Sequence, residues 1–87
     1  VAEGRIYVIG GESLQSAHTF EQNEVLDPAT GRWEPAADLP TPRHGVASAT
    51  FGCRIAVIGG ARASGRRSFG TLSQVIEVYE GACGKAI

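Results

Sequence analysis

The sequence predicts an all-β fold built from two copies of one antiparallel sheet unit. The first observation is a repeated phrase, since IYVIGG at residues 6–11 returns as IAVIGG at residues 55–60, an offset of 49. The second is that EVL at residues 24–26 returns as EVY at residues 77–79, an offset of 53. The third is that no segment combines the periodicity and the capping residues of a helix. A period near 50 residues is typical of a supersecondary unit that recurs along the chain.

Each copy begins with a short strand that ends in a Gly-Gly pair. The runs 5–9 and 54–58 are rich in β-branched residues and apolar at successive positions, so we expect both to be buried on both faces. Segments 22–26 and 75–79 follow as second strands. The extra residues of the second copy fall in the loop between these two strands, where an insertion costs little.

The first copy continues into a hairpin. The proline of DPATG (residues 27–31) is placed for a type I turn, and its glycine for the left-handed position that closes the turn. The strand that follows, 32–36, carries Trp33, and its Pro35 cannot donate a hydrogen bond, which places this strand at a sheet edge. The next strand, 46–51, is made mostly of small residues, which suit a crowded place where several strands converge.

In this order, the segments RIYVIGG, EVLDPATGRW and LPTPRHG resemble the kelch repeat, whose four-stranded sheets are the blades of a β-propeller. The resemblance runs from Gly4 to Tyr79. It implies that residues 1–37 supply strands b, c and d of one blade. Residues 38–87 then supply strands a, b and c of the next blade, whose outer strand is missing. The predicted fold is therefore all-β, with antiparallel meander sheets forming two incomplete blades of a kelch-type β-propeller.

Incomplete blades predict that the chain is a fragment of a longer propeller or is completed by other copies. Stacked repeats generally need at least about three units to bury their faces. The start at Val1 rather than at Met favours the fragment. The number of blades, the oligomeric state and whether the ending after Tyr79 is native are left open.

Composition excludes some classes of partner. With 87 residues and a net charge of −1, the chain offers no basic surface that predicts a nucleic acid as partner. No apolar stretch approaches the roughly 18 residues of a membrane span, so no membrane partner is expected either. Cys53 and Cys83 are the two cysteines, and they are either a disulfide or two unrelated thiols, which leaves the compartment open.

The sequence predicts no catalytic residue, metal site or cofactor. The spacing of glycines in segment 60–65 is that of a phosphate-binding loop, but Arg66 and Arg67 stand where that motif needs Lys and then Ser or Thr. His18 and His44 are the only histidines, and no G-x-S-x-G motif accompanies them. None of the histidines and cysteines falls at the spacing of metal ligands.

The predicted binding surface is one rim of the propeller. In an antiparallel meander, loops 12–21 and 61–74 and the connection 39–44 emerge on the same face. The ligand-binding candidates on this rim are Arg43, His44, Arg62, Arg66, Arg67 and Glu12. In kelch proteins such loops commonly form the ligand face, and the resemblance implies that Arg43 lies near the channel mouth. Guanidinium groups on a concave rim suit carboxylates, sulfates or acidic peptide side chains.

Structural roles stand beside these functional ones. In the alternative interpretation, the arginines of residues 62–67 pair with nearby glutamates or are solvated in a long loop. Arg43 has the alternative of bonding carbonyl groups between blades. Glu24 and Glu77 occupy the same repeat position, which favours a structural role in each blade. Trp33 and Tyr79 are expected to be packing aromatics.

The function predicted first is non-catalytic recognition, by a kelch-repeat scaffold that presents its rim loops to a protein or to a small anionic ligand. Further blades would come from the parent chain or from other copies. The alternative is a segment of a kelch-fold enzyme similar to galactose oxidases or sialic-acid mutarotases. In that case the catalytic residues would lie mostly outside this chain.

Overall fold

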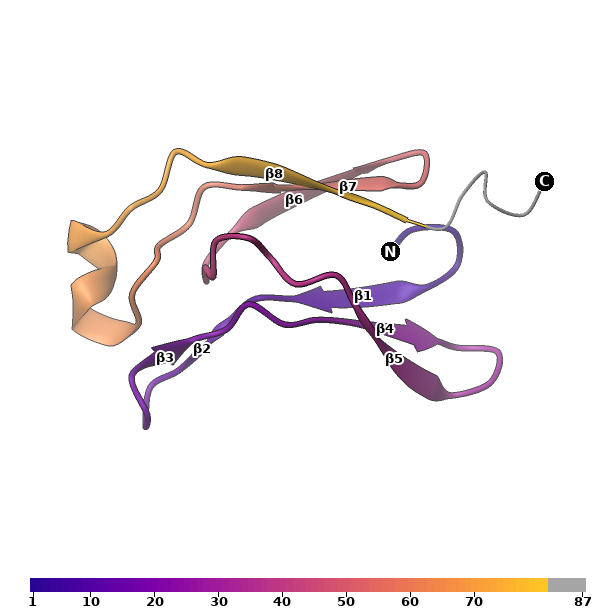
Figure 1. The fold of residues 1–87 in the computed structure, drawn as a ribbon, viewed down its shortest axis with the longest axis horizontal. Coiled ribbons are helices and arrows are strands. Elements are labelled where there is room, and N and C mark those ends of the chain that lie inside the picture. The colour runs from indigo at the N-terminus through magenta and orange to yellow at the C-terminus, as the bar shows by residue number, and fades with distance from the viewer. Residues whose placement is uncertain (82–87) are drawn as a thin grey trace.

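The computed structural model describes residues 1–81, which form two three-stranded antiparallel sheets facing each other (Figure 1). The first sheet has the order β1–β4–β5, with β1 at Ile6–Ile9, β4 at Asn23–Asp27 and β5 at Arg32–Ala36. The second has the order β6–β7–β8, with β6 at Ala47–Phe51, β7 at Arg54–Ile58 and β8 at Ile76–Glu80. The predicted all-β fold of antiparallel meanders is confirmed.

The sequence repeat is also a repeat of strand pairing. Val8 of β1 lies opposite Glu24 of β4, and Val57 of β7 lies opposite Glu77 of β8. Adding the sequence offset of 49 to Val8 gives Val57, and adding the offset of 53 to Glu24 gives Glu77. The two phrases therefore encode the same pair of antiparallel strands in the same register.

The hairpin between β4 and β5 forms as its sequence predicts. Gly31 has a φ of 72°, and its N–H donates to the Asp27 carbonyl at 2.8 Å. The Asp27 carboxylate accepts a second bond from the Ala29 N–H at 2.9 Å, as aspartates in turns commonly do. The edge position that Pro35 predicts is confirmed, because β5 pairs with β4 alone.

Two short elements inside the loops were not predicted. β2 (Glu12–Ser13) and β3 (His18–Thr19) form a small hairpin between β1 and β4. A 3₁₀ helix, η1 (Gly65–Gly70), lies between β7 and β8. Both are too short to show a hydrophobic period in the sequence. They lie at the same end of the molecule, on the left of Figure 1.

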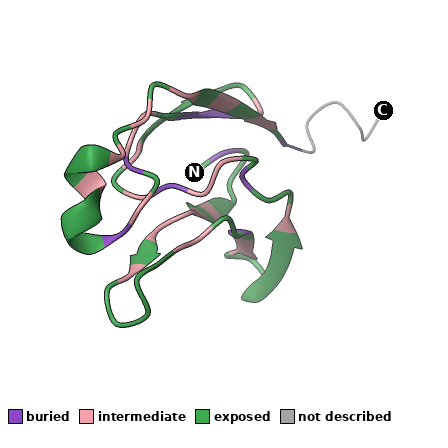
Figure 2. Cartoon of the chain, turned by 60° about the vertical axis from the view of Figure 1, so that its left-hand side comes forward, coloured by how far each residue is buried: buried purple, intermediate pink, exposed green. Residues whose placement is uncertain are grey.

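A small core lies between the two sheets, and Figure 2 shows how few positions of the described residues are buried. Its buried members are Ala2, Leu39, Ile55 and Val57, against which Tyr7, Ile9, Val46 and Tyr79 pack. The rings of Tyr7 and Tyr79 have centroids 5.4 Å apart and join the first sheet to the second. Burial, and then the neighbouring Tyr79, raises the pKa of Tyr7 above its ordinary value of 10.0. Tyr79 is therefore a packing aromatic, as expected.

The expectation of strands buried on both faces is right for β7 and wrong for β1. In β7, Ile55, Ala56 and Val57 are all buried. In β1, Ile6 and Val8 are 39 % and 50 % exposed. The reason is that successive side chains of a strand point to opposite faces, and only the face with Tyr7 and Ile9 turns to the core.

Two further packing expectations are also wrong for this chain. Every residue of β6 is exposed, so the small side chains of that strand are not in a crowded environment. Trp33 on β5 is 54 % exposed and is not a packing aromatic. Both strands are edge strands, each paired with a single neighbour within residues 1–81.

Some predictions fall on residues 82–87, outside the described part of the chain. These are the pairing of Cys53 with Cys83 and the nature of the ending after Tyr79. Within residues 1–81, no helix has the length and apolar character required to span a membrane.

Candidate functional site

Three segments meet at the end of the molecule that carries β2, β3 and η1. The connection from β5 to β6 runs between the loop after β1 and the loop after β7. The Gly11 N–H donates to the Arg43 carbonyl at 2.9 Å. On the other side, His44 and Ala61 exchange two backbone hydrogen bonds, each of 3.0 Å. The predicted shared rim is therefore present, and backbone hydrogen bonds hold its three segments together.

The Gly-Gly pairs leave room for this connection. A Cβ on Gly10 would lie 2.5 Å from the Arg43 carbonyl oxygen, and one on Gly60 would lie 2.5 Å from the His44 carbonyl oxygen. Both glycines also have positive φ angles, of 69° and 79°. A side chain at either position would therefore push the connection out of its place.

Arg43 lies fully buried where the connection reaches the second sheet. Its guanidinium donates to the carbonyls of Val57 at 3.4 Å, Gly59 at 3.0 Å and Val75 at 3.0 Å. It also bonds the Glu77 carboxylate at 2.6 Å. A planar, permanently charged group with several donors suits such a set of acceptors converging from two strands.

These contacts make Arg43 a clamp that fastens the connection to the second sheet. Its side chain is 0 % exposed, so no ligand at the rim reaches it in this structure. The Thr41 hydroxyl donates to the second oxygen of Glu77 at 3.0 Å, which completes the pairing of that carboxylate. The guanidinium is therefore buried against carbonyl groups of the second sheet alone, and it is not displayed at a surface.

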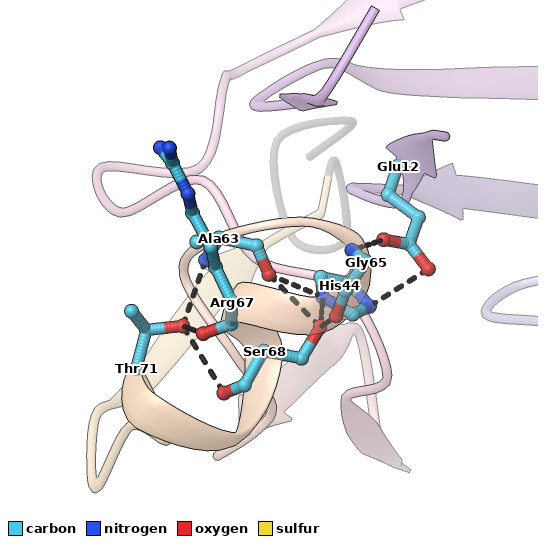
Figure 3. Close-up of polar contacts among 7 residues, drawn as sticks. All are labelled: Glu12, His44, Ala63, Gly65, Arg67, Ser68 and Thr71. Atoms are coloured by element: carbon cyan, nitrogen blue, oxygen red, sulfur yellow. Dashed lines mark hydrogen bonds and ion pairs between the residues drawn. The ribbon is translucent and has the colours of Figure 1, made fainter. Parts of the chain in front are cut away.

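His44, Glu12 and Ser68 form a second cluster on the rim (Figure 3). His44 Nδ1 lies 3.4 Å from Glu12 Oε1, and Glu12 Oε2 accepts the Gly65 N–H at 2.9 Å. His44 Nε2 lies 2.7 Å from the Ala63 carbonyl and 3.0 Å from Ser68 Oγ. The cluster therefore ties the loop of the first sheet to η1 in the loop of the second.

The order Glu–His–Ser is that of a hydrolytic triad, but the hydrogen bonds differ from those of a triad. The Ala63 carbonyl can only accept, so Nε2 of His44 carries a proton and donates it. A protonated Nε2 does not remove the proton of Ser68, whose hydroxyl bonds the Gly65 carbonyl at 2.6 Å. His44 is therefore arranged as a bridge between loops, because a catalytic serine requires a histidine that accepts its proton.

Replacing Glu12 with Gln is expected to loosen η1 without unfolding the sheets. The variant loses the charge that strengthens the bond to the Gly65 N–H and the pairing with His44, both at a partly solvated position. Hydrogen exchange at the Gly65 amide should become about fivefold faster, which corresponds to about 1 kcal/mol. Glu21→Gln, which changes an exposed acid of the same loop, is the control. Unchanged protection at Gly65 would show that the contacts of Glu12 contribute nothing to the stability of η1.

Comparison with known families adds the identity of the repeat. Residues 1–40 match the family model described as the Kelch motif. The chain therefore carries a kelch repeat. A search of the curated proteins returned no match to the chain.

The kelch match covers the Gly-Gly pair after β1, the DPATG turn and Trp33. The second sheet repeats the glycine pair and the strand register of the first. We call the first and second sheets the first and second blades, and three strands of each are formed within the described residues.

The remaining candidates lie on the exposed part of the same rim. Arg62, Arg66 and Arg67 are all exposed, and within residues 1–81 none of them forms an ion pair. In Figure 3 the side chain of Arg67 points away from Glu12 and His44. The backbone carbonyl of Arg67 instead accepts the Thr71 hydroxyl at 3.1 Å, which helps to hold the end of η1. Three guanidinium groups are thus available to a partner.

Sequence reasoning missed the apolar side chains beside these arginines. Phe69 and Leu72 are 85 % and 68 % exposed, and Leu14 on the facing loop is 73 % exposed. The Leu14 side chain lies 3.8 Å from the position that a Cβ on Gly65 would occupy, so the two loops are neighbours here. The sequence did contain a signal for them, namely large apolar residues within otherwise polar loops. Such residues often mark an interaction surface rather than a core.

The described residues hold no evident metal site. No group of three or more His, Cys, Asp and Glu side chains within residues 1–81 is arranged to bind a metal ion. A hollow of about 470 Å³ lies between the two blades, and Asn23, Leu39 and Glu77 are among its lining residues. Its walls come from strands of both sheets and from the connection between them.

Proposed function

We propose that this kelch chain is a non-catalytic binding scaffold whose rim takes an acidic segment of a protein partner. The observation that carries the proposal is the surface of η1 and its neighbours, which we call the arginine rim. It consists of Arg62, Arg66, Arg67, Phe69, Leu72 and Leu14.

The composition of the arginine rim favours a protein over a small anion. A sulfate or a carboxylate would need the guanidinium groups alone. Exposed Phe69 and Leu72 add apolar area next to those charges, and aromatic residues and arginine are the types enriched in protein interfaces. An acidic segment that also carries apolar side chains would contact both kinds of group.

The loops that carry the arginine rim are held in place before a partner arrives. Glu12 and His44 tie η1 to the first blade, and Arg43 ties the connection to the second. Loops that are already ordered lose less conformational entropy on binding, which favours affinity. This is the arrangement expected of a recognition surface.

The enzymatic alternative is a segment of a kelch-fold oxidase or mutarotase. Within residues 1–81 no specific observation favours it. The one cluster that resembles a catalytic group, Glu12 with His44 and Ser68, has its histidine proton directed at the Ala63 carbonyl. We therefore propose the binding role alone.

The test is binding of a fluorescein-labelled hexaglutamate peptide, followed by fluorescence anisotropy at low and at moderate salt. The triple variant Arg62→Gln, Arg66→Gln, Arg67→Gln should weaken binding at least tenfold, because each exposed charge contributes up to about 1 kcal/mol. Binding to the unaltered chain should also weaken as salt is raised.

The matched control removes the same charge from the other end of the blades. Arg5, Arg32 and Arg54 are exposed arginines near the opposite loops. The triple variant Arg5→Gln, Arg32→Gln, Arg54→Gln should bind the peptide as the unaltered chain does. Equal weakening by both triple variants would mean that only net charge matters, and the proposal would then be wrong.

A further inference from the structure

The clamp of the second blade has a counterpart in the first. Arg43 bonds four groups of the second blade, namely the carbonyls of Val57, Gly59 and Val75 and the carboxylate of Glu77. The repeat offsets convert these into the carbonyls of Val8, Gly10 and Gln22 and the carboxylate of Glu24. The first blade thus carries the same acceptors at the same places in its strands.

In the structure these residues lie around a hollow. A concavity of about 310 Å³ is lined by Val8, Gly10, Phe20, Gln22 and Glu24. The backbone frame matches as well, since the Gly10 N–H donates to Gln22 at 2.9 Å and the Gly59 N–H donates to Val75 at 2.9 Å. We call this hollow the first-blade socket.

Within the described residues, the first-blade socket has no occupant. Glu24 is exposed and makes no side-chain hydrogen bond or ion pair to any residue of 1–81, whereas its counterpart Glu77 is bonded by both Arg43 and Thr41. Among residues 1–81, the carboxylate at this repeat position therefore has two partners in one blade and none in the other.

The glycine pairs give a second, independent indication. A Cβ on Gly60 would collide with the His44 carbonyl and with Val46, because the connection runs there. At Gly11, the equivalent glycine, nothing lies within 4 Å of such a Cβ. The space beside Gly11 is therefore where an equivalent connection would run.

We propose that the first-blade socket takes an arginine side chain from a further kelch blade, carried on a connection like residues 38–46 of this chain. Three carbonyls and one carboxylate are best satisfied by a flat cation with several hydrogen-bond donors. A guanidinium group meets this requirement better than an ammonium group does. The backbone of the incoming connection would bridge to Glu12, as that of His44 bridges to Ala61 in the second blade. This inference rests on the repeat and does not depend on the proposed rim function.

A second copy of this chain fits the socket less well. The arginine with the required setting is Arg43, and in each copy it is already buried in that copy's second blade. Within residues 1–81 no other arginine follows a Pro-Thr-Pro sequence. The occupant is thus a connection from a further blade rather than the same segment of another copy.

The experiment adds the missing connection as a peptide. The acetylated and amidated peptide DLPTPRHGV, which reproduces residues 38–46, is titrated into the ¹⁵N-labelled 87-residue chain and followed by NMR. We expect amide shifts at Val8, Gly10, Gln22 and Glu24. A peptide in which norleucine replaces the arginine should bind at least tenfold more weakly, because it has no donor for the four acceptors.

A matched pair of variants tests the carboxylate. Glu24→Gln should weaken peptide binding about tenfold. Glu34→Gln removes the same charge from the opposite face of the same sheet, because Glu34 pairs with Val25 rather than with Glu24. It should leave binding unchanged. The triple change of the arginine rim should also leave it unchanged, so failure of the rim proposal and failure of this one are separable.

Several outcomes would overturn the inference. Equal binding of the arginine and norleucine peptides would exclude a guanidinium socket. Shifts at Val57 and Glu77 in place of those at Val8 and Glu24 would mean that the peptide only displaces Arg43. Self-association of the chain that Glu24→Gln abolishes would identify a second copy as the occupant.

Discussion

Arg43→Ala is expected to abolish cooperative folding of the chain. The change leaves the Glu77 carboxylate and the carbonyls of Gly59 and Val75 without their common donor, in a place that is 0 % exposed around the arginine. Removing one partner of a buried ion pair costs about 3–5 kcal/mol. Domains of this size have little stability in excess of that. Urea denaturation followed by far-ultraviolet circular dichroism measures the loss.

Two variants show whether the effect belongs to the clamp. Arg62→Ala removes an exposed arginine of the rim and should change the free energy of unfolding by no more than about 0.5 kcal/mol. Arg43→Lys keeps the charge but not the planar set of donors, so its stability should fall between the two. If Arg43→Ala were as stable as Arg62→Ala, the clamp would contribute nothing to holding the connection on the second blade.

Gly60→Ala is the second change with a large expected effect. The new Cβ would meet the His44 carbonyl oxygen at 2.5 Å, and that oxygen belongs to the backbone and accepts the Ala61 N–H. The connection must therefore move, and the Arg43 clamp that it carries moves with it. We expect a loss of about 2–4 kcal/mol in the free energy of unfolding, from backbone strain and overpacking together.

Gly31→Ala separates the two causes. Gly31 has a φ of 72°, close to the 79° of Gly60, but nothing lies within 4 Å of the added Cβ. It should lose only the about 1–2 kcal/mol that a left-handed conformation costs a residue with a side chain. The difference between the two variants in the same denaturation experiment measures the close approach. Equal losses would show that the connection adjusts freely.

Local sequence was sufficient for most strands and turns. The boundaries expected for β5 and β7, 32–36 and 54–58, are those of the structure. The DPATG hairpin and the edge position of β5 also follow from Gly31 and Pro35, because both depend on backbone conformation within a few residues. The resemblance to the kelch repeat could be inferred from these signals and from their order along the chain.

Burial was predicted less well, because it depends on what lies beside a strand. The similar runs of β1 and β7 differ in exposure, because Ile55 and Val57 of β7 face the core whereas the alternate positions of β1 do. Trp33 is exposed for the same kind of reason. Apolar composition shows that a side chain is suited to burial, but not that another element covers it.

The candidate site divides in the same way. Arg62, Arg66 and Arg67 were found from their repeat position and loop, and the structure leaves them exposed. The cluster of Glu12 with His44 was not predicted, although both residues were candidates. Their contact and that of Glu12 with Gly65, 53 residues further along, form only when the two blades face each other.

The sequence by itself determined that the chain is all-β, that it repeats one strand pair, and that loops of both copies share a rim. These properties follow from backbone preferences and from a repeat that can be read residue by residue. Only the tertiary structure decided that Arg43 is a buried clamp and that Glu24, the first-blade equivalent of Glu77, has no partner within residues 1–81. The physical reason is that a charged side chain takes its role from the groups that surround it, and here those groups come from segments far apart in the chain.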